Sequence, residues 1–275
     1  MKKLLPTLIL SAAALALLAG CSQQTADNKA PAEKKELVLG GSSMPYGIVF
    51  EKGIKPIMEK KGYTIKTMNF STLDVNNQAV NNGEVDFNLD QHTAYINVYN
   101  KNKNTHLMPL VHTPLIPAAI YSEKYKAFDQ APNGATVLIP NDASNTTRAL
   151  RILAKANLIT FKASANKDQL TPQDIDKNTK NLKIKEMDSV IIPRALVDSD
   201  FGSISGGIAY QSKVDPKKIV IREDVAPEME MTVAINEKNK DTQWAKDLKE
   251  AYQSQEFKDF MNTFNKDGMW VMPKG

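Results

Sequence analysis

The sequence predicts an α/β fold with largely parallel sheets, and three observations support this prediction. Short apolar runs alternate with stretches of helical periodicity from about residue 36 to the end of the chain. The chain has 275 residues, of which 42% are hydrophobic and 24% are charged, a composition typical of a folded protein. This length suits one large domain or two lobes of about 100–150 residues each.

The elements expected in the first half follow from residue spacing and from stop signals. The apolar run 37–41 predicts a buried strand, and Phe50, Ile54 and Ile57 recur at helical spacing, which predicts a helix over 47–61 that ends at Gly62. The same criteria predict strands at 63–69 and 85–89, helices at 74–82 and 92–101, and two strands with bends within 106–122.

The second half continues this alternation. A strand over 136–139 precedes a helix over 146–156, in which Leu150, Leu153 and Ala154 recur at helical spacing. The remaining predictions are strands at 182–186, 201–205, 219–223 and 231–236, a short helix at 191–197, and two closing helices, one near 241–253 and one carrying Phe257, Phe260, Met261 and Phe264.

The first 21 residues have the pattern of an export signal. Lys2 and Lys3 precede an apolar run that is too short for a comfortable membrane span, and this run ends in Leu-Ala-Gly-Cys at Cys21. The pattern resembles a bacterial lipobox, so we expect residues 1–20 to be removed and Cys21 to carry acyl chains that anchor the protein. The alternative is an ordinary secretory signal with a chance cysteine. The segment 21–35 is then a lipidated cysteine followed by a polar, flexible tether.

Composition excludes several other classes of protein. A single cysteine excludes an intrachain disulfide framework, a cysteine-based zinc site and an iron–sulfur site. Removal of Lys2 and Lys3 with the signal lowers the formal net charge from +4 to +2, and no basic stripe of the kind used by nucleic-acid binders is present.

The first polar segment that could carry chemistry is 140–150. Ser144 or Asn145 is a suitable N-cap for the helix that follows, which would place Arg148 in the first turn. A guanidinium beside free backbone N–H groups could bind a carboxylate. The alternative is a surface arginine paired with Asp142.

Two more segments lie where ligands bind in α/β folds, beyond the carboxyl ends of strands. His92 and Tyr95 are three residues apart at a helix start, where they could face a ligand or form a satisfied polar cap. The glycine-rich segment 201–211 lets a ligand approach the backbone closely, but its spacing matches no nucleotide-binding motif.

Enzyme signatures are absent from the sequence. It contains no G-x-S-x-G and no H-E-x-x-H motif, and the only thiol is assigned to the lipid anchor. The three histidines have no metal-ligand spacing. We therefore expect no catalytic activity, no metal site and no cofactor.

Several segments together resemble the methionine-binding lipoproteins of the NlpA lipoprotein family, the substrate-binding components of methionine ABC importers. The resemblance covers nearly all of residues 36–275. The segments that carry it are Gly83-Glu84-Val85-Asp86, Gln91-His92 with Tyr95, Ile120-Tyr121-Ser122, Ile139-Pro140-Asn141-Asp142 with Asn145 and Arg148-Ala149-Leu150, and Gly206 with Ala209 and Gln211.

This resemblance implies a two-lobed fold of the periplasmic-binding-protein type (type II-like), with mixed, mostly parallel sheets flanked by helices and a hinge between the lobes. It implies one lobe from 36–117 with 225–275 and a second from 118–224. The protein would bind an amino-acid-like ligand by hinge closure and deliver it to an ABC permease and its ATPase. It would be lipid-anchored to a cell membrane and face the periplasm or the extracellular side.

The resemblance also implies a ligand site. Arg148 would bind the amino-acid carboxylate, with His92, Tyr95 and Asn145 in or beside the pocket. Five pocket positions depart from the family pattern: Leu73 and Asp90 replace aromatic residues, Ser205 and Gly207 replace asparagines, and Glu230 stands where an asparagine is common.

A thioether side chain prefers an apolar, aromatic slot, so the added carboxylates bear on the ligand. Buried charge is costly unless it is paired. The ligand is therefore either methionine, with Asp90 and Glu230 paired with Arg148 or with local lysines or pointing outward, or a polar or cationic amino acid or amine. A surface lipoprotein enzyme and an adhesin-like interaction protein are the alternatives from other classes.

Overall fold

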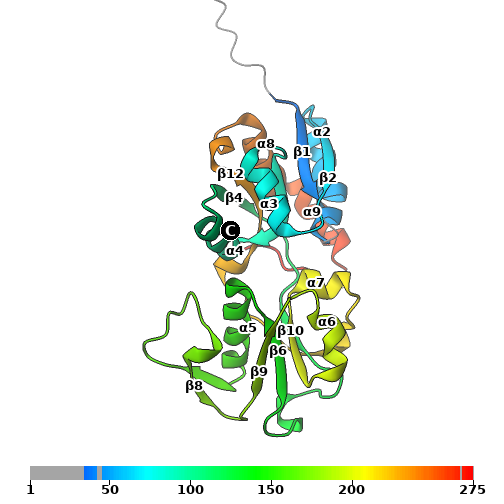
Figure 1. The fold of residues 1–275 in the computed structure, drawn as a ribbon. Helices are drawn as coiled ribbons and strands as arrows, with labels where there is room; N and C mark the ends of the chain where they lie inside the picture. The colour runs from blue at the N-terminus through cyan, green and yellow to red at the C-terminus, as the bar shows by residue number, and fades with distance from the viewer. Residues whose placement is uncertain (1–33, 42–44, 267, 275) are drawn as a thin grey trace, which may run out of the picture. The chain divides into compact units, whose positions relative to one another are not determined.

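The computed structural model describes residues 34–41, 45–266 and 268–274, and all the features below lie within these ranges. The predicted signal peptide, Cys21 and most of the predicted tether fall outside them. The described chain forms two five-stranded mixed sheets flanked by helices, which confirms the α/β fold class (Figure 1).

The first sheet has the strand order β2-β1-β3-β12-β4. The bounds of its strands are β1 Glu36–Gly41, β2 Thr64–Asn69, β3 Phe87–His92, β4 Leu107–His112 and β12 Met231–Asn236. The pairs β1/β2 and β1/β3 are parallel, whereas β12 runs antiparallel to both β3 and β4. All six residues of β12 are buried, as is typical of a strand that is covered on both faces.

Helices cover both faces of this sheet. Their bounds are α1 Tyr46–Val49, α2 Lys55–Lys60, α3 Leu73–Asn82, α4 Thr93–Lys103, α8 Gln243–Gln253 and α9 Gln255–Phe264. Residues of α3 and α4 pack on one face, and residues of α1, α2, α8 and α9 form the larger core on the other. A π-helical turn, Phe50–Ile54, joins α1 to α2, and a Cβ on Gly53 would lie 2.6 Å from Phe260. The absence of a side chain at Gly53 therefore lets α9 pack closely.

The second sheet has the strand order β11-β5-β10-β6-β9. Its strands are β5 Ala119–Tyr121, β6 Thr136–Pro140, β9 Lys183–Met187, β10 Phe201–Ile204 and β11 Ile219–Arg222. The pairs β6/β9 and β10/β6 are parallel, and the pairs β10/β5 and β11/β5 are antiparallel. Residues of α5 (Ala143–Lys155) pack on one face, and residues of α6 (Ile192–Ala195) and α7 (Gly206–Gln211) pack on the other (Figure 1).

Short segments join the two sheets. Residues 113–118 lead from β4 to β5, and residues 223–230 lead from β11 to β12. Near the C-terminus, the backbones of Leu115 and Val271 form a β-bridge, with N–H to carbonyl distances of 3.0 and 2.7 Å.

The structure corrects three details of the sequence prediction. β3 extends to His92, so Asp90 lies on a strand and not in a loop. α5 begins at Ala143, and Asp142 is its N-cap in place of the expected Ser144 or Asn145, which puts Arg148 in the second turn. A hairpin of β7 (Ile159–Phe161) and β8 (Ile175–Asn178) was not expected.

Candidate functional site

The start of α5 is built around the carboxylate of Asp142. Its Oδ1 accepts hydrogen bonds from the backbone N–H of Asn145 at 3.0 Å and from the hydroxyl of Ser144 at 2.9 Å. The amide group of Asn145 also donates to both oxygens of Asp142 at 3.1 Å. These bonds orient Asn145 so that its side-chain oxygen faces away from Asp142.

Arg148 forms a buried ion pair that the sequence did not reveal. Its Nε donates to Oε2 of Glu223 at 2.6 Å, and its Nη2 donates to Oε1 of the same residue. The two side chains are only 7% and 4% exposed. Burial disfavours the charged guanidinium, but the carboxylate of Glu223 outweighs it and raises the pKa of Arg148. The expected alternative, an exposed arginine paired with Asp142, is therefore wrong.

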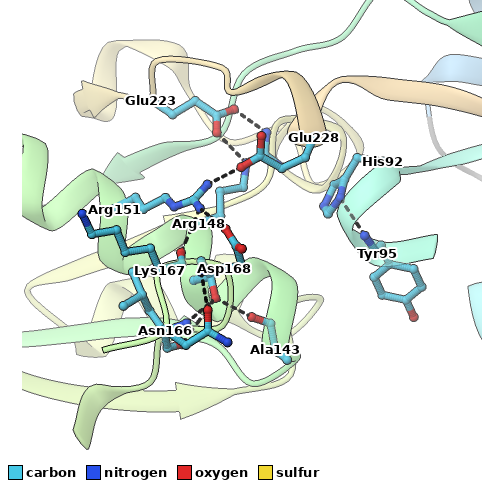
Figure 2. A network of polar contacts seen from close by, with 12 residues as sticks. His92, Tyr95, Ala143, Arg148, Arg151, Asn166, Lys167, Asp168, Glu223 and Glu228 are labelled. Atoms are coloured by element: carbon cyan, nitrogen blue, oxygen red, sulfur yellow. Dashed lines mark hydrogen bonds and ion pairs between the residues drawn. The ribbon is translucent and has the colours of Figure 1, made fainter. Parts of the chain in front are cut away.

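Glu223 also joins the two segments that connect the sheets. Its Oε1 accepts the backbone N–H of Ala118 at 2.7 Å, and its own N–H donates to the carbonyl of Ala118 at 3.0 Å. Figure 2 shows Glu223 and Glu228 reaching from this segment toward Arg148 and Arg151 of α5. Glu223, in the connection 223–230, therefore links this connection both to Ala118 of the connection 113–118 and to the guanidinium of Arg148.

His92 reaches Asn145 from the other sheet. It is the N-cap of α4, where its Nδ1 accepts the backbone N–H of Tyr95 at 3.1 Å, so the ring proton resides on Nε2. Nε2 lies 3.3 Å from Oδ1 of Asn145 and can donate to it. Burial, together with the charge of Arg148, lowers the pKa of His92 to about 4, so the ring is neutral at pH 7. His92 thus forms the polar cap that was one of the two expectations, and it also meets Asn145.

Tyr95 lies beside His92, and its ring is half-buried. Its ring meets that of His92 edge-on at 6.3 Å and stacks on Tyr99 at 6.5 Å. Burial raises the pKa of Tyr95 to about 12, so the hydroxyl is protonated at neutral pH and can donate a hydrogen bond.

Tyr46 is a site residue that the sequence analysis missed. It is 6% exposed, and burial raises its pKa above the ordinary range, while the charges of Arg148, Asp90 and Glu223 also act on it. The only sequence signal was its position directly after the first strand, among the turns where ligands bind. Asp90 is half-buried. Its charge also raises the pKa of Tyr252, although burial is the main cause of that shift.

The other candidate residues occupy different places. Leu73 is half-buried at the first position of α3, and Ser205 and Gly207 lie at the start of α7. Glu230 does not join Arg148: one of its oxygens pairs with Nδ1 of His112 at 2.7 Å, and the other accepts the backbone N–H of Lys274 at 3.1 Å. Glu230 is thus held by a histidine of β4 and by the backbone of Lys274, and its place in a ligand pocket stays a prediction.

Other polar residues near the site have a structural role. Asn88 and Gln91 bond to Asn77 of α3, with distances of 2.6 to 2.9 Å, and all three side chains are buried. Their hydrogen bonds satisfy one another and fix α3 to β3, so these amides do not require a ligand.

A cavity of about 180 Å³ lies against α5 on the side of the 223–229 segment. Three basic residues of one helix face line it, and each pairs with an acid of that segment: Arg148 with Glu223, Arg151 with Glu228 at 2.6 Å, and Lys155 with Asp224 at 2.6 Å. Because these charges neutralise one another, the cavity marks a row of ion pairs between α5 and the 223–229 segment. These ion pairs hold the segment on the helix.

Within residues 34–41, 45–266 and 268–274, no group of three or more histidine, cysteine, aspartate or glutamate side chains could hold a metal ion. In the same part of the chain, every helix is too short or too polar to cross a membrane.

Comparison with known proteins gives one consistent result. The family model for the NlpA lipoprotein matches residues 37–272. The chain is 36% identical to Lipoprotein 28 of Escherichia coli O157:H7 and 33% identical to the D-methionine-binding lipoprotein MetQ of Salmonella typhi, in each case over 87% of both chains.

Solved structures agree with the family model. A nutrient-binding protein from Burkholderia cenocepacia, solved with bound methionine, superposes with a TM-score of 0.78 at 32% identity and covers 86% of this chain and 99% of its own. The crystal structure of a methionine-binding lipoprotein from Bacillus subtilis has a TM-score of 0.79 at 29% identity, over 86% of this chain and 98% of its own. The family model spans residues 37–272, which include both sheets and Arg148, and this chain is therefore a member of the NlpA lipoprotein family.

Proposed function

We propose that this chain is the lipid-anchored substrate-binding protein of an ABC importer and that it binds an amino-acid-like ligand between its two sheets. One observation carries the proposal. His92, from the first sheet's side, lies 3.3 Å from Asn145 at the start of the second sheet's α5, and the buried guanidinium of Arg148 on the same helix acts electrostatically on His92 and Tyr46. Relatives support the same role, since one solved neighbour at 32% identity carries methionine.

Arg148 has a free edge for the ligand. Its hydrogen bonds to Glu223 use Nε and Nη2, and none of the described residues accepts a hydrogen bond from Nη1. A ligand carboxylate would bind at this edge, while the neutral ring of His92 adds no competing charge. The ammonium group of the ligand would lie toward Asp90, a half-buried carboxylate near the end of β3 on the first sheet's side.

We propose that the closing motion takes place between two lobes. The first lobe comprises residues 36–117 and 225–275, and the second comprises residues 118–224. Each sheet has its own hydrophobic cores, and only short segments join the two sheets. In the mature protein, Cys21 would hold the chain on a cell membrane, facing the periplasm or the extracellular side. The closed, loaded protein would then meet a permease and its ATPase.

The ligand is either methionine or a more polar or cationic amino acid. Methionine is supported by the relatives. The second possibility is raised by Asp90, a half-buried carboxylate that stands where the family pattern has an aromatic residue. Glu230 does not contribute to this argument, since His112 already pairs with it.

Isothermal titration calorimetry with a panel of amino acids and small amines tests the proposal. We expect one member to bind, and we expect Arg148→Ala to cost about 2–5 kcal/mol of binding free energy, because truncation of a buried charge partner has this effect. Arg151→Ala is the matched control, since Arg151 lies one turn along the same helix and pairs with Glu228. Equal losses in the two variants would remove Arg148 from the site.

The same panel separates the proposal from other classes of protein. Binding to the native state raises the free energy of unfolding by about 2.7 kcal/mol at a ligand concentration of 100 Kd, so the melting temperature should rise with the ligand. Turnover of a panel member would indicate an enzyme. No binding and no melting shift with any member would refute the transport role.

A further inference from the structure

The described C-terminal segment, residues 268–274, is held in a defined position. The side chain of Asn265, just after α9, forms two hydrogen bonds with the backbone of Trp270. Its Nδ2 donates to the carbonyl of Trp270 at 2.8 Å, and its Oδ1 accepts the N–H of Trp270 at 2.9 Å. Trp270 is 6% exposed and belongs to the larger core of the first sheet.

This C-terminal segment touches both of the segments that join the sheets. Val271 pairs with Leu115 of the first connection by two backbone hydrogen bonds. Lys274 donates its N–H to the carboxylate of Glu230, at the end of the second connection. A segment bonded to both connections is part of the hinge about which the two lobes would move.

The ring of Trp270 meets Tyr46 and Phe264 on the first sheet's side and Tyr210 on the second sheet's side. It packs edge-on against Tyr46 of α1, with ring centres 5.8 Å apart, and lies 6.4 Å from the ring of Tyr210 of α7. Tyr46 belongs to the first sheet's core, whereas α7 packs on the second sheet. Tyr210 is 39% exposed, so its contact with Trp270 is the less enclosed of the two.

The start of α7 is fixed on the first connection. A Cβ on Gly206 would lie 2.0 Å from the carbonyl oxygen of Ile116, so the two backbones are in direct contact. Tyr210 lies one turn further along α7, near the end of the helix. Any rotation of the second lobe about this point changes the distance between Tyr210 and Trp270.

We propose that Trp270 couples ligand binding to hinge closure: it stays packed on Tyr46 beside the ligand site while its contact with Tyr210 tightens as the lobes close. This inference rests on the proposed function. Trp270 is a positioning residue, because it acts through Tyr46 and the hinge without touching the ligand. Since Trp270 contacts Tyr46 in the core of the first sheet and Tyr210 of α7 on the second sheet, a motion of one lobe against the other changes the contact with Tyr210.

Fluorescence gives a direct test, because the chain contains two tryptophans. Trp244 is 3% exposed, inside the first core and next to Phe87, far from any moving contact. In Trp244→Phe, the remaining signal comes from Trp270, and we expect L-methionine to change its emission intensity or maximum. In the matched variant Trp270→Phe, we expect L-methionine to bind with no change in the emission of Trp244.

Affinity gives a second readout that core packing alone would not produce. Tyr210→Ala removes the contact and should weaken L-methionine binding about fivefold or more, the size of a typical coupling between two sites. Tyr210→Phe keeps the ring and should bind as the unmodified protein does. Circular dichroism and melting temperature of the free variants would show that an exposed side chain was removed without loss of fold.

The outcomes separate this inference from the proposed function. If calorimetry selects another amino acid, that amino acid replaces L-methionine as the probe. A protein that binds no member of the panel would overturn the proposed function, and this inference with it. A protein that binds in calorimetry, but whose Trp270 emission is unchanged at saturation and whose Tyr210→Ala variant keeps its affinity, would overturn this inference alone.

Discussion

Replacement of Glu223 by glutamine tests the buried ion pair on which the candidate site depends. Glu223→Gln keeps one oxygen that can accept the N–H of Ala118 but removes the charge that faces Arg148. The guanidinium is 7% exposed and has Glu223 as its hydrogen-bonding partner, so it would remain buried without a counter-charge.

The expected loss of stability follows from this geometry. Removal of one partner from a buried pair costs about 3–5 kcal/mol of unfolding free energy. Since glutamine retains one acceptor, we expect the lower end of this range, about 3 kcal/mol. For a protein of this size, each kcal/mol shifts the melting temperature by roughly 2–4 °C, so the loss corresponds to roughly 6–12 °C.

Urea unfolding followed by circular dichroism measures the loss. The slope of the unfolding free energy against urea should stay constant, which shows that only stability has changed. Asp224→Asn is the matched control: Asp224 is the next residue and pairs with Lys155, but its side chain is 83% exposed, so we expect a change of less than about 0.5 kcal/mol. A change below about 1 kcal/mol in Glu223→Gln would refute the view that Arg148 requires this counter-charge.

Two further predictions concern pH and packing. The pKa of His92 is about 4 in the folded protein against 6.5 when unfolded, so its contribution is complete above pH 6.5 and is lost as the pH falls toward 4. Between pH 7 and pH 5, the unfolding free energy of the unmodified protein should therefore fall by about 2 kcal/mol more than that of His92→Asn. Asparagine keeps an oxygen that can cap α4 but does not titrate. Equal pH dependence of the two proteins in urea titrations would contradict this prediction. Gly206→Ala should lose about 1–3 kcal/mol or more because its Cβ would meet the Ile116 carbonyl oxygen at 2.0 Å, whereas Gly47→Ala has nothing within 4 Å and should be neutral or stabilising in the same assay.

Most of the fold could be predicted because its elements carry strong local signals. α3 lies between Thr72, whose side chain caps its first turn, and Gly83, whose φ of 82° suits the end of a helix. β12 is a run of buried residues that no helical spacing matches. The β7/β8 hairpin was missed because β8 is mostly polar and exposed, so it lacks the alternation that marks a strand.

The site was less predictable because its partners meet only in the folded chain. Arg148, His92 and Asn145 were expected and do come together. Glu223 and Asp224 are adjacent acids with no local difference, yet one side chain is 4% exposed and the other 83%. For the same reason, nothing near Glu230 in the sequence indicates that His112, from a distant strand, pairs with it.

The place of β12 in the first sheet has a consequence for how the protein folds. β12 lies between β3 and β4, although both of those strands precede it by the whole of the second sheet. During synthesis, all strands of the second sheet are available before β12 emerges, while β3 and β4 still have unpaired edges. Such edges are prone to pair with other chains, and contacts between distant parts of a chain form slowly. The sheet whose strands begin first is therefore completed last, when β12 joins β3 and β4.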